Sequence, residues 1–512
     1  MTIEQRIGII DIGSNSIRLA VYERTASGAH RVIDGSKRPA RLSGAIDEQG
    51  RLMPDKIDEL VDIMNHYRLI CTHHRTGHIR TVATAAIRNA INRDEIVDRL
   101  QEETGMTIEV ISGEEEARFG FLGMINSLDV RDGFLIDIGG GSTEISLFRD
   151  RTLVQSVSFP FGCVNMSRSF LTEDGTLPDT TLQTLEETVH AALEREPWLQ
   201  WSPGLPLVGV GGTVRALGKL DQAISKYSFP LNHNYNISAA RTDDLFEQLR
   251  FVPTEKRNKM PGLSKDRADV FITGLAILRV VYRKLQSTHY LVCGAGLRDG
   301  LFFDTRFSAK PRLDDVLGYS VRNLCALHPE APPIHVVQVN RIAMQLFEAL
   351  NRQTELPERA ALWLDAASTL FRIGASIDYY QYSKHTYYLI INSHLNGLSH
   401  REIVIIAAIA SFKGKSKLRQ QLAEFRDLLS ESDIETAALL GMLLQLSIAL
   451  DRSETQSIGR LAVTAENGIL KLSAVTSSGP LDIERAEVDE LSKDFRKAWK
   501  LLPVLEMPYH NG

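Results

Sequence analysis

The chain has few cysteines and no hydrophobic run long enough to span a membrane. Only four cysteines occur among its 512 residues, namely Cys71, Cys163, Cys293 and Cys325. They lie far apart and form no C-x-x-C motif, which excludes a disulfide framework and the usual cysteine zinc sites. The longest apolar runs, residues 403–412 and 437–450, are shorter than the roughly 18 residues of a membrane span. Because its start also lacks a signal-peptide pattern, we predict a cytoplasmic protein that is not membrane-bound.

The sequence also lacks a strong charge of either sign. Its 58 Lys and Arg residues against 64 Asp and Glu residues give a net charge of -6 at pH 7. This balance does not indicate a nucleic-acid partner, so any polyanion would need a local basic groove. The 36 Gly and 18 Pro residues are near average usage, which excludes collagen-like and largely disordered chains. The length and composition predict a globular protein of more than one domain.

An internal repeat is present in the N-terminal half. Residues 10–22 (IDIGSNSIRLAVY) align without a gap on residues 136–148 (IDIGGGSTEISLF), at an offset of 126 residues. In each copy an apolar strand ends at an Asp, turns through Gly and small polar residues, and resumes as a second apolar strand. The repeat therefore predicts two β-hairpins in two related lobes.

Helical and strand-like segments alternate through the first 306 residues. Apolar residues have helical spacing at 54–70 and 92–103, whereas 78–83, 205–210 and 290–293 are typical of strands. Beyond residue 312 nearly every periodic segment is helical, and turn residues reappear near the C-terminus. We predict an α/β fold of two lobes, followed by an all-helical domain and a small α+β part, at residues 1–128, 129–306, 312–455 and 456–512.

Three glycine-rich turns have the composition of phosphate-binding loops. Glycines let the backbone approach a phosphate closely, and small hydroxyl or amide side chains add hydrogen-bond donors. One such turn alone is equally consistent with a tight hairpin, but three favour a phosphate site. Duplication of this kind is typical of the actin-like phosphotransferase superfold, in which paired loops face each other across a cleft. The candidate phosphate-binding residues are Asp11, Gly13, Ser14, Asn15, Ser16, Gly139, Gly140, Gly141, Ser142, Thr143, Gly211, Gly212 and Thr213.

An acidic triplet, residues 114–116, opens a predicted helix directly after a strand. One interpretation is a helix N-terminus enriched in Glu, which suits the helix macrodipole. The other is that one carboxylate of the triplet reaches the cleft as the general base for an attacking water. The position of the triplet between the two lobes favours the second interpretation.

Five motifs follow one another along the first 300 residues. They are DIGSNS at 11–16, ISGEEEAR at 111–118, IDIGGGSTE at 136–144, GGT at 211–213 and PGL at 261–263. In this combination the sequence resembles the exopolyphosphatase / guanosine pentaphosphate phosphohydrolase family. The Ser-Gly-x-Glu-Glu-Ala-Arg element distinguishes that family from actin-like sugar kinases and chaperone ATPases. The resemblance implies two actin-like, ribonuclease H-like lobes around a cleft.

The resemblance also implies roles for individual residues. Glu116 would be the catalytic carboxylate with Glu115 as its neighbour, and Arg88 would lie near the reacting phosphates. Asp137 would be linked to a metal ion, and Glu144 closes the same loop. Mg²⁺ or another divalent cation is the expected cofactor, because carboxylates, water and phosphate oxygens are its usual ligands. Without the resemblance, Arg88 would be interpreted as a solvent-facing helix arginine.

The implied reaction is hydrolysis of a phosphoric anhydride. Glu116 would deprotonate a water that attacks the terminal phosphorus of inorganic polyphosphate, and orthophosphate would be released. A pppGpp 5'-phosphohydrolase would use the same loops, so the sequence does not separate these two activities. A non-catalytic polyphosphate or nucleotide sensor is the alternative of another class. We expect a homodimer, with no nucleic-acid partner.

The helical half resembles an HD phosphohydrolase domain without its metal-binding dyad. Residues 370–374 (LFRIG) stand where a working HD domain has His-Asp, while His385 and Asp451 persist at HD-like places. Two separated ligands do not make a metal site, so His385 is interpreted as a helix-capping or hydrogen-bonded residue and Asp451 as a helix-end residue. Lys413 and Lys415 in this half, like the basic residues of 256–267, are expected either to contact substrate or to be solvated surface.

Overall fold

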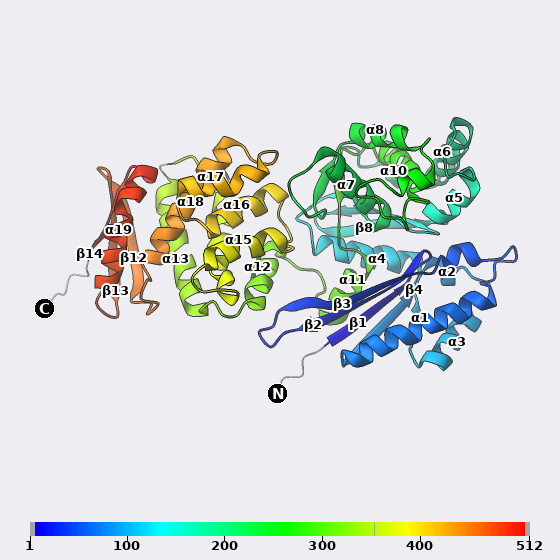
Figure 1. Cartoon of the computed structure of the whole chain (residues 1–512), viewed down its shortest axis with the longest axis horizontal. Helices are drawn as coiled ribbons and strands as arrows, with labels where there is room; N and C mark the ends of the chain where they lie inside the picture. Colours follow the sequence, from blue (N-terminus) through cyan, green and yellow to red (C-terminus); the bar gives the residue numbers. More distant parts are fainter. Residues whose placement is uncertain (1–5, 353, 507–512) are drawn as a thin grey trace. The chain divides into compact units, whose positions relative to one another are not determined.

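The computed structural model describes residues 6–352 and 354–506, and it divides the chain into two compact units (Figure 1). Unit 1 comprises residues 6–26, 30–227 and 231–316. Unit 2 comprises the described residues from 317 onward, together with 27–29 and 228–230. Unit 1 contains both predicted lobes, and unit 2 contains the helical half and the C-terminal strands.

The first lobe of unit 1 is a five-stranded sheet in the order β3-β2-β1-β4-β5. Its strands are β1 (Arg6–Ile12), β2 (Ser16–Arg24), β3 (His30–Pro39), β4 (His78–Ala83) and β5 (Ile108–Val110). Its helices are α1 (Pro54–His73), α2 (Ala85–Arg88), α3 (Arg93–Thr104), α4 (Gly113–Ile125) and the 3₁₀ turn η1 (Leu42–Ala45). Apolar side chains of α1 and α3, such as Leu60 and Leu100, pack on Ile10 and Leu19 of the sheet. The predicted helices at 54–70 and 92–103 and the strand at 78–83 are confirmed.

The second lobe is a six-stranded sheet in the order β10-β11-β9-β6-β7-β8. Its strands are β6 (Gly133–Ile138), β7 (Thr143–Arg149), β8 (Thr152–Phe159), β9 (Leu207–Val210), β10 (Tyr235–Ile237) and β11 (Tyr290–Val292). Its helices are α5 (Cys163–Phe170), α6 (Asp179–Leu193), η2 (Pro197–Gln200), α7 (Gly211–Ser225), α8 (Ala239–Leu249), α9 (Thr254–Arg257) and α10 (Phe271–Leu285). Along β6, Phe134 and Ile136 join the core beneath α10, while Leu135 faces the opposite core. Burial on both faces explains the continuous apolar run of this strand.

The two repeats form hairpins with the same register. Strands β1 and β2 pair Asp11 with Arg18 and Ile12 with Ile17, leaving residues 13–15 as the turn. Strands β6 and β7 pair Asp137 with Glu144 and Ile138 with Thr143, with the turn at residues 139–142. The predicted pair of hairpins is confirmed. Each hairpin therefore ends its first strand one residue after an Asp.

Helices α4 and α11 (Leu297–Arg306) lie between the two sheets (Figure 1). Phe121 and Met124 of α4 pack on the second sheet, while α11 contacts β1 of the first. The two helices approach closely because a Cβ atom at Gly300 would lie 1.9 Å from the carbonyl oxygen of Phe119. This packing fixes the N-terminal end of α4, which carries the acidic triplet.

Unit 2 is helical up to residue 449 and ends in a small sheet with order β12-β13-β14. Its helices are α12 (Val316–Leu327), α13 (Pro333–Asn351), α14 (Ala360–Leu370), η3 (Ile373–Ser376), α15 (Tyr382–Asn392), α16 (His400–Ala410), α17 (Lys415–Leu422), η4 (Ala423–Phe425), α18 (Glu431–Ala449) and α19 (Asp482–Trp499). Its strands are β12 (Ile458–Glu466), β13 (Ile469–Ser477) and β14 (Leu502–Glu506). The turn between β12 and β13 lies at Asn467 and Gly468.

Helix α18 is long and apolar enough to cross a membrane by length and composition alone. However, 67% of its apolar window is buried inside the structure. It packs against α13, α14, α16 and α19 of the same unit. This is the arrangement of a core helix, because its apolar surface already has partners within the protein.

Candidate active site

The two hairpin turns face each other across a cavity of about 110 Å³ in unit 1. A Cβ atom at Gly140 would lie only 3.1 Å from Cβ of Ser14, so glycine is what permits this approach. The carbonyl oxygens of Gly139 and Gly140 accept hydrogen bonds from the backbone amides of Cys163 and Val164 at the start of α5. The turn is thereby held with its carbonyl groups directed toward α5. The backbone amides of this turn can then donate hydrogen bonds to an anion in the cavity.

The third glycine-rich turn brings the N-terminus of α7 to the same cavity. Gly211 has a φ of +80°, and a Cβ atom there would lie 2.3 Å from Oδ1 of Asp137. Only glycine allows this backbone conformation and this contact together. The N-cap residue, Val210, provides no side-chain cap, so the first amides of α7 keep their hydrogen-bonding capacity for a ligand. A helix N-terminus of this kind favours a phosphate group.

The structure gives the glutamates of the acidic triplet different roles. Oγ of Ser112 accepts a hydrogen bond from the amide of Glu115 at 3.1 Å, and Oε2 of Glu115 accepts one from the amide of Ser112 at 2.8 Å. This is a capping box at the start of α4, so Glu115 stabilises the helix end. Glu116 instead lines the cavity. The macrodipole interpretation thus describes Glu115, and the general-base interpretation fits the position of Glu116.

Arg88 holds the Glu116 carboxylate in place. Its Nη1 atom lies 2.9 Å from Oε2 of Glu116 and 3.0 Å from the carbonyl oxygen of Ile111. The Arg88 side chain is 17% exposed, which differs from the solvent-facing arginine expected without the family resemblance. Its guanidinium contacts the candidate base, and it does not itself line the cavity. Arg88 therefore acts on Glu116 in this structure, whereas the resemblance placed it near the phosphates.

The environment of Glu116 makes this carboxylate a suitable proton acceptor. Burial raises the pKa of Glu116 to about 7, because the ionised form loses water. The Arg88 guanidinium opposes this rise in pKa, whereas the negative charges of Asp137 and Asp11 add to it. A general base is most effective when its pKa lies near the pH at which it works. Glu116 has that property.

Four carboxyl groups gather at this end of the cleft. Burial raises the pKa of Asp11, Asp137 and Glu144, and their mutual repulsion adds to the shift for Asp137 and Glu144. Glu144 does not line the cavity and accepts a hydrogen bond from Oγ of Ser158 at 2.7 Å. No group of three His, Cys, Asp or Glu side chains among the described residues is arranged to hold a metal ion unaided. The donor set fits a cation bound by one or two carboxylates together with phosphate oxygens.

Four arginines also line the cavity, and the sequence motifs identified only one of them as part of a basic cluster. They are Arg18, Arg215, Arg267 and Arg298. None of the four forms an ion pair with a carboxylate in the part of the chain that the structure describes. Burial, together with the positive charges of Arg215 and Arg298, lowers the pKa of Arg18 to about 10. Guanidinium groups that repel one another in this way provide a strong site for an anion.

A second cavity, of about 420 Å³, shares these four arginines and Gly212 with the first. It adds Lys37, which is ion-paired with Asp266, and Lys219. A Cβ atom at Gly262, from the PGL motif, would lie 2.4 Å from the carbonyl oxygen of Lys219. This glycine therefore allows the PGL turn to pack on α7 beside the cavity. Among the described residues, the lining of the second cavity includes six basic side chains and no acidic or aromatic one.

Comparison with known proteins matches both units. A model described as the Ppx/GppA phosphatase family matches residues 20–308, which is more than half of the chain. The chain belongs to the Ppx/GppA phosphatase family. A second model, described as Ppx/GppA phosphatase, domain III, matches residues 333–492. The family assignment and the predicted α/β actin-like fold with a helical C-terminal domain are confirmed, as is a hydrolase of phosphoric anhydrides.

Curated and solved relatives resemble the chain over much of its length. A guanosine-5'-triphosphate,3'-diphosphate pyrophosphatase from Vibrio vulnificus is 27% identical over 407 residues, covering 78% of this chain and 79% of the relative. One with the same name from Photobacterium profundum is 26% identical and covers 86% of each chain. The crystal structure of the Aquifex aeolicus family member has a TM-score of 0.52 at 27% identity, covering 60% of this chain and 99% of that one. An exopolyphosphatase structure from Cytophaga hutchinsonii, at 23% identity and a TM-score of 0.55, shares the fold.

The structure brings most of the predicted phosphate-binding residues of this family member to one cavity. Its lining includes Asp11, Gly13, Ser14, Asn15, Ser16, Gly139, Gly140, Ser142, Gly211 and Gly212. Gly141, Thr143 and Thr213 are not in the lining, and the hydroxyl of buried Thr143 donates to the carbonyl oxygen of Phe161. The Thr143 hydroxyl thus supports its loop and does not face the cavity. No motif predicts a role for Arg18, Arg215 or Arg298, because each lies outside the glycine-rich turns.

The basic residues predicted in the helical half belong to unit 2. Lys415 is ion-paired with Glu435, and Lys413 lines a separate cavity in that unit. Asp451 lies just after the end of α18, as interpreted from the sequence, and it is buried and hydrogen-bonded to His335. His385 lies on α15 and does not line this cavity. His335 has no signal in the sequence, because a lone histidine on an apolar helix face belongs to no motif.

Proposed function

We propose that this phosphatase is an exopolyphosphatase, which releases orthophosphate from the end of inorganic polyphosphate. The proposal rests on the two adjoining cavities of unit 1. Glu116 lines the first, and the second is lined by six basic side chains. A polyphosphate chain carries a negative charge at every unit, so it suits a groove whose four arginines form no ion pair with a carboxylate among the described residues. The terminal phosphate would lie at Glu116, with the rest of the chain along the second cavity.

The proposed reaction is an in-line attack of water on the terminal phosphorus. Glu116 accepts the proton of the water, while Arg88 keeps its carboxylate directed at the cavity. The loop amides and the first amides of α7 hold the phosphate oxygens, together with Arg215 and Arg267. The bond to the next phosphate breaks, so orthophosphate is released from the shortened chain. Charge stabilisation by positioned donors is the main contribution of the protein to such a reaction.

We propose Mg²⁺ as the cofactor, held by Asp137 with Asp11 or Glu144. These carboxyl groups repel one another in a buried place, and a cation would relieve that repulsion. When bound, such an ion supplies positive charge that offsets the charge developing on phosphate oxygens. Asp137 is the central candidate, because it lines the cavity and contacts the third turn at Gly211.

The second candidate function is hydrolysis of the 5'-phosphate of pppGpp. The names of the two curated relatives favour it, because both are called guanosine-5'-triphosphate,3'-diphosphate pyrophosphatases. The same loops and Glu116 would serve either substrate. Within the described residues, neither cavity is lined by an aromatic side chain on which a guanine base would stack. This absence of a stacking partner is why we rank polyphosphate first.

One assay separates the two functions. Phosphate release is measured side by side from long-chain polyphosphate, tripolyphosphate and pppGpp, at equal ionic strength with Mg²⁺. We expect kcat/KM to rise with polyphosphate chain length and to exceed the value for pppGpp. A higher kcat/KM for pppGpp would replace the first proposal with the second. Saturable binding of all three without phosphate release would favour a non-catalytic sensor.

We also propose that the protein is a cytoplasmic homodimer. All four cysteines are free thiols, and Cys71, Cys163 and Cys293 are buried, which suits a reducing compartment. Sedimentation at several concentrations tests the oligomeric state. A single species with the mass of one chain would contradict the dimer.

A further inference from the structure

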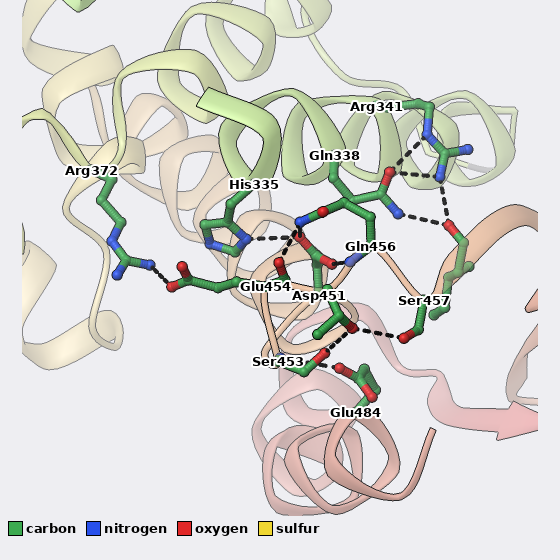
Figure 2. Close-up of polar contacts among 12 residues, drawn as sticks. His335, Gln338, Arg341, Arg372, Asp451, Ser453, Glu454, Gln456, Ser457 and Glu484 are labelled. Carbon is green, nitrogen blue, oxygen red and sulfur yellow. Dashed lines mark hydrogen bonds and ion pairs between the residues drawn. The ribbon is translucent and has the colours of Figure 1, made fainter. Parts of the chain in front are cut away.

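A buried His-Asp pair lies in unit 2 (Figure 2), and the cavity beside it shares no lining residue with the two cavities of unit 1. Nδ1 of His335 on α13 lies 2.8 Å from Oδ2 of Asp451, and their side chains are only 2% and 1% exposed. Asp451 also accepts a hydrogen bond from the backbone amide of Gln456 at 2.9 Å. With the Asp451 carboxylate as the acceptor, Nδ1 of His335 donates in this pair. The second ring nitrogen of His335, Nε2, takes no part in this hydrogen bond.

Two nitrogen atoms at this place have no partner. Nε2 of His335 and Nε of Arg372 are buried and form no hydrogen bond among the described residues. Figure 2 shows Nε2 on the side of the ring opposite Asp451, toward Arg372. Both side chains line a cavity of about 280 Å³. A buried polar atom without a partner costs free energy, which a bound ligand would recover.

The polar side chains that line the cavity indicate which charge the ligand carries. Nε of Arg372 and Nζ of Lys413 are donors only, so the ligand must bring acceptor atoms. Nε2 of His335 is a third, buried polar atom at this place, and a phosphate group can meet it through an oxygen or an O–H in either tautomer. No group of three His, Cys, Asp or Glu residues able to hold a metal occurs within the described ranges. An oxyanion therefore fits this place better than a metal ion.

The other residues that line the cavity indicate which further groups the ligand contains. Glu454 and Glu487 are ion-paired with Arg372 and Arg452, which leaves Glu490 as an acceptor without a charged partner in the described structure. An acceptor beside an anion site suits the hydroxyl groups of a sugar. The rings of Tyr379 and Tyr382 each lie 5.6 Å from the guanidinium carbon of Arg372, so this cation is held in a fixed position.

We propose that this cavity binds a small phosphomonoester that carries hydroxyl groups, such as a sugar phosphate or a nucleoside monophosphate. Its phosphate lies at His335, Arg372 and Lys413, and its hydroxyl groups lie at Glu490. A phosphate has three terminal oxygens for the three nitrogen atoms, whereas a carboxylate has two. The segment that lacks His-Asp, residues 370–374, supplies Arg372.

The site is tested by calorimetric titration of the full chain with ribose 5-phosphate, with AMP and with orthophosphate. We expect ribose 5-phosphate or AMP to bind at least tenfold more tightly than orthophosphate, because only these esters reach Glu490. The variant Arg372→Gln should weaken ester binding at least tenfold, and Lys413→Gln, at an exposed position, should weaken it several-fold. His335→Asn keeps a donor to Asp451 and removes Nε2, so it should also weaken binding.

Control variants distinguish this site from the cleft of unit 1. Arg267→Gln, in the cleft, should leave ester binding at the unit 2 site unchanged. Arg372→Gln should keep its thermal unfolding midpoint and its hydrolysis of tripolyphosphate, which excludes a general folding defect. Unchanged ester affinity in both Arg372→Gln and Lys413→Gln would overturn the proposal. Absence of saturable ester binding at millimolar concentrations, or orthophosphate binding as tightly as the esters, would overturn it as well.

Discussion

Nη1 of Arg88 lies 2.9 Å from Oε2 of Glu116, and the same atom contacts the carbonyl oxygen of Ile111. This arginine therefore ties the start of α4 to the end of the first sheet. It opposes the rise in pKa that burial causes at Glu116, and it fixes the direction of the carboxylate. A base that is both buried and ion-paired keeps a pKa near neutrality while remaining in one position.

The first prediction concerns Glu116 itself. Glu116→Gln keeps the shape of the side chain but accepts no proton, so kcat should fall by roughly 10²–10⁴. The dissociation constant for polyphosphate should change little. Glu115→Gln is the matched control, because it makes the same chemical change at the capping box and should lose a little stability but little activity. The two variants are compared by steady-state phosphate release and thermal unfolding, and equal activity in both would refute the assignment of Glu116.

The second prediction concerns pH. Because the pKa of Glu116 is about 7, its carboxylate is protonated below that value, and kcat/KM should rise with pH up to about 7 and then level off. Arg88→Gln removes the guanidinium charge beside Glu116, so the pKa of Glu116 should rise further. The rising part of the pH profile should then shift to higher pH. The pKa of Glu116 lies above its unfolded value, so its stabilising effect is complete below about 4.5 and is lost as pH rises through 7.

Profiles of kcat/KM against pH for both proteins check this prediction. Glu115→Gln again serves as the control, with a profile that should overlay the wild type. If the rising part of the profile lies at the same pH in Arg88→Gln as in the wild type, a group other than Glu116 limits the rate.

The sequence predicted the two hairpins because their register depends on local residues. Each hairpin is encoded within 13 residues, which contain the Asp, the glycine turn and the apolar positions of both strands. A single sequence is therefore enough to predict the hairpin. Arg18, Arg215 and Arg298 reach the cavity from β2, α7 and α11, which are brought together only by the packing of the sheets. Their convergence depends on long-range contacts that no local pattern records. The same applies to His335 and Asp451, which are 116 residues apart.

The different roles of Glu115 and Glu116 were only partly predictable. A Ser three residues before a Glu predicts a capping box, and Ser112 and Glu115 have this spacing. That signal assigns Glu115 to the helix end and leaves Glu116 on a different face. Burial of Glu116, and hence its raised pKa, follows from the packing of α4 between the sheets and is not visible in the sequence.

The third prediction concerns the cation. Asp137→Asn removes one negative charge from the cavity and should raise the Mg²⁺ concentration for half-maximal activity at least tenfold. Asp132→Asn, just before the same strand and outside the cavity, is the matched control and should titrate like the wild type. The measurement is phosphate release over a range of Mg²⁺ concentrations at constant ionic strength. An unchanged Mg²⁺ titration in Asp137→Asn would exclude Asp137 as a ligand.

The fourth prediction concerns the path of the polyphosphate chain. Lys219→Gln removes a charge from the second cavity and should weaken binding of long polyphosphate by at most about 1 kcal/mol, or roughly fivefold. The effect on tripolyphosphate should be smaller, because a short chain extends less far from Glu116. Dependence of binding on salt should become shallower, since fewer counterions are released. Lys226→Gln, at the exposed end of the same helix and outside the cavity, is the control.

The same measurement applied to unit 2 tests the lysines of the helical half. Lys415→Gln breaks an ion pair with Glu435, so it should change polymer binding less than Lys219→Gln. Lys413→Gln should affect binding of ribose 5-phosphate more than binding of polyphosphate, because Lys413 lines the third cavity. If instead the two variants in unit 2 weaken long-chain binding as much as Lys219→Gln and spare tripolyphosphate, the polymer path must include the helical half. That result would extend the substrate groove beyond unit 1, because only a long chain would then contact both sets of lysines.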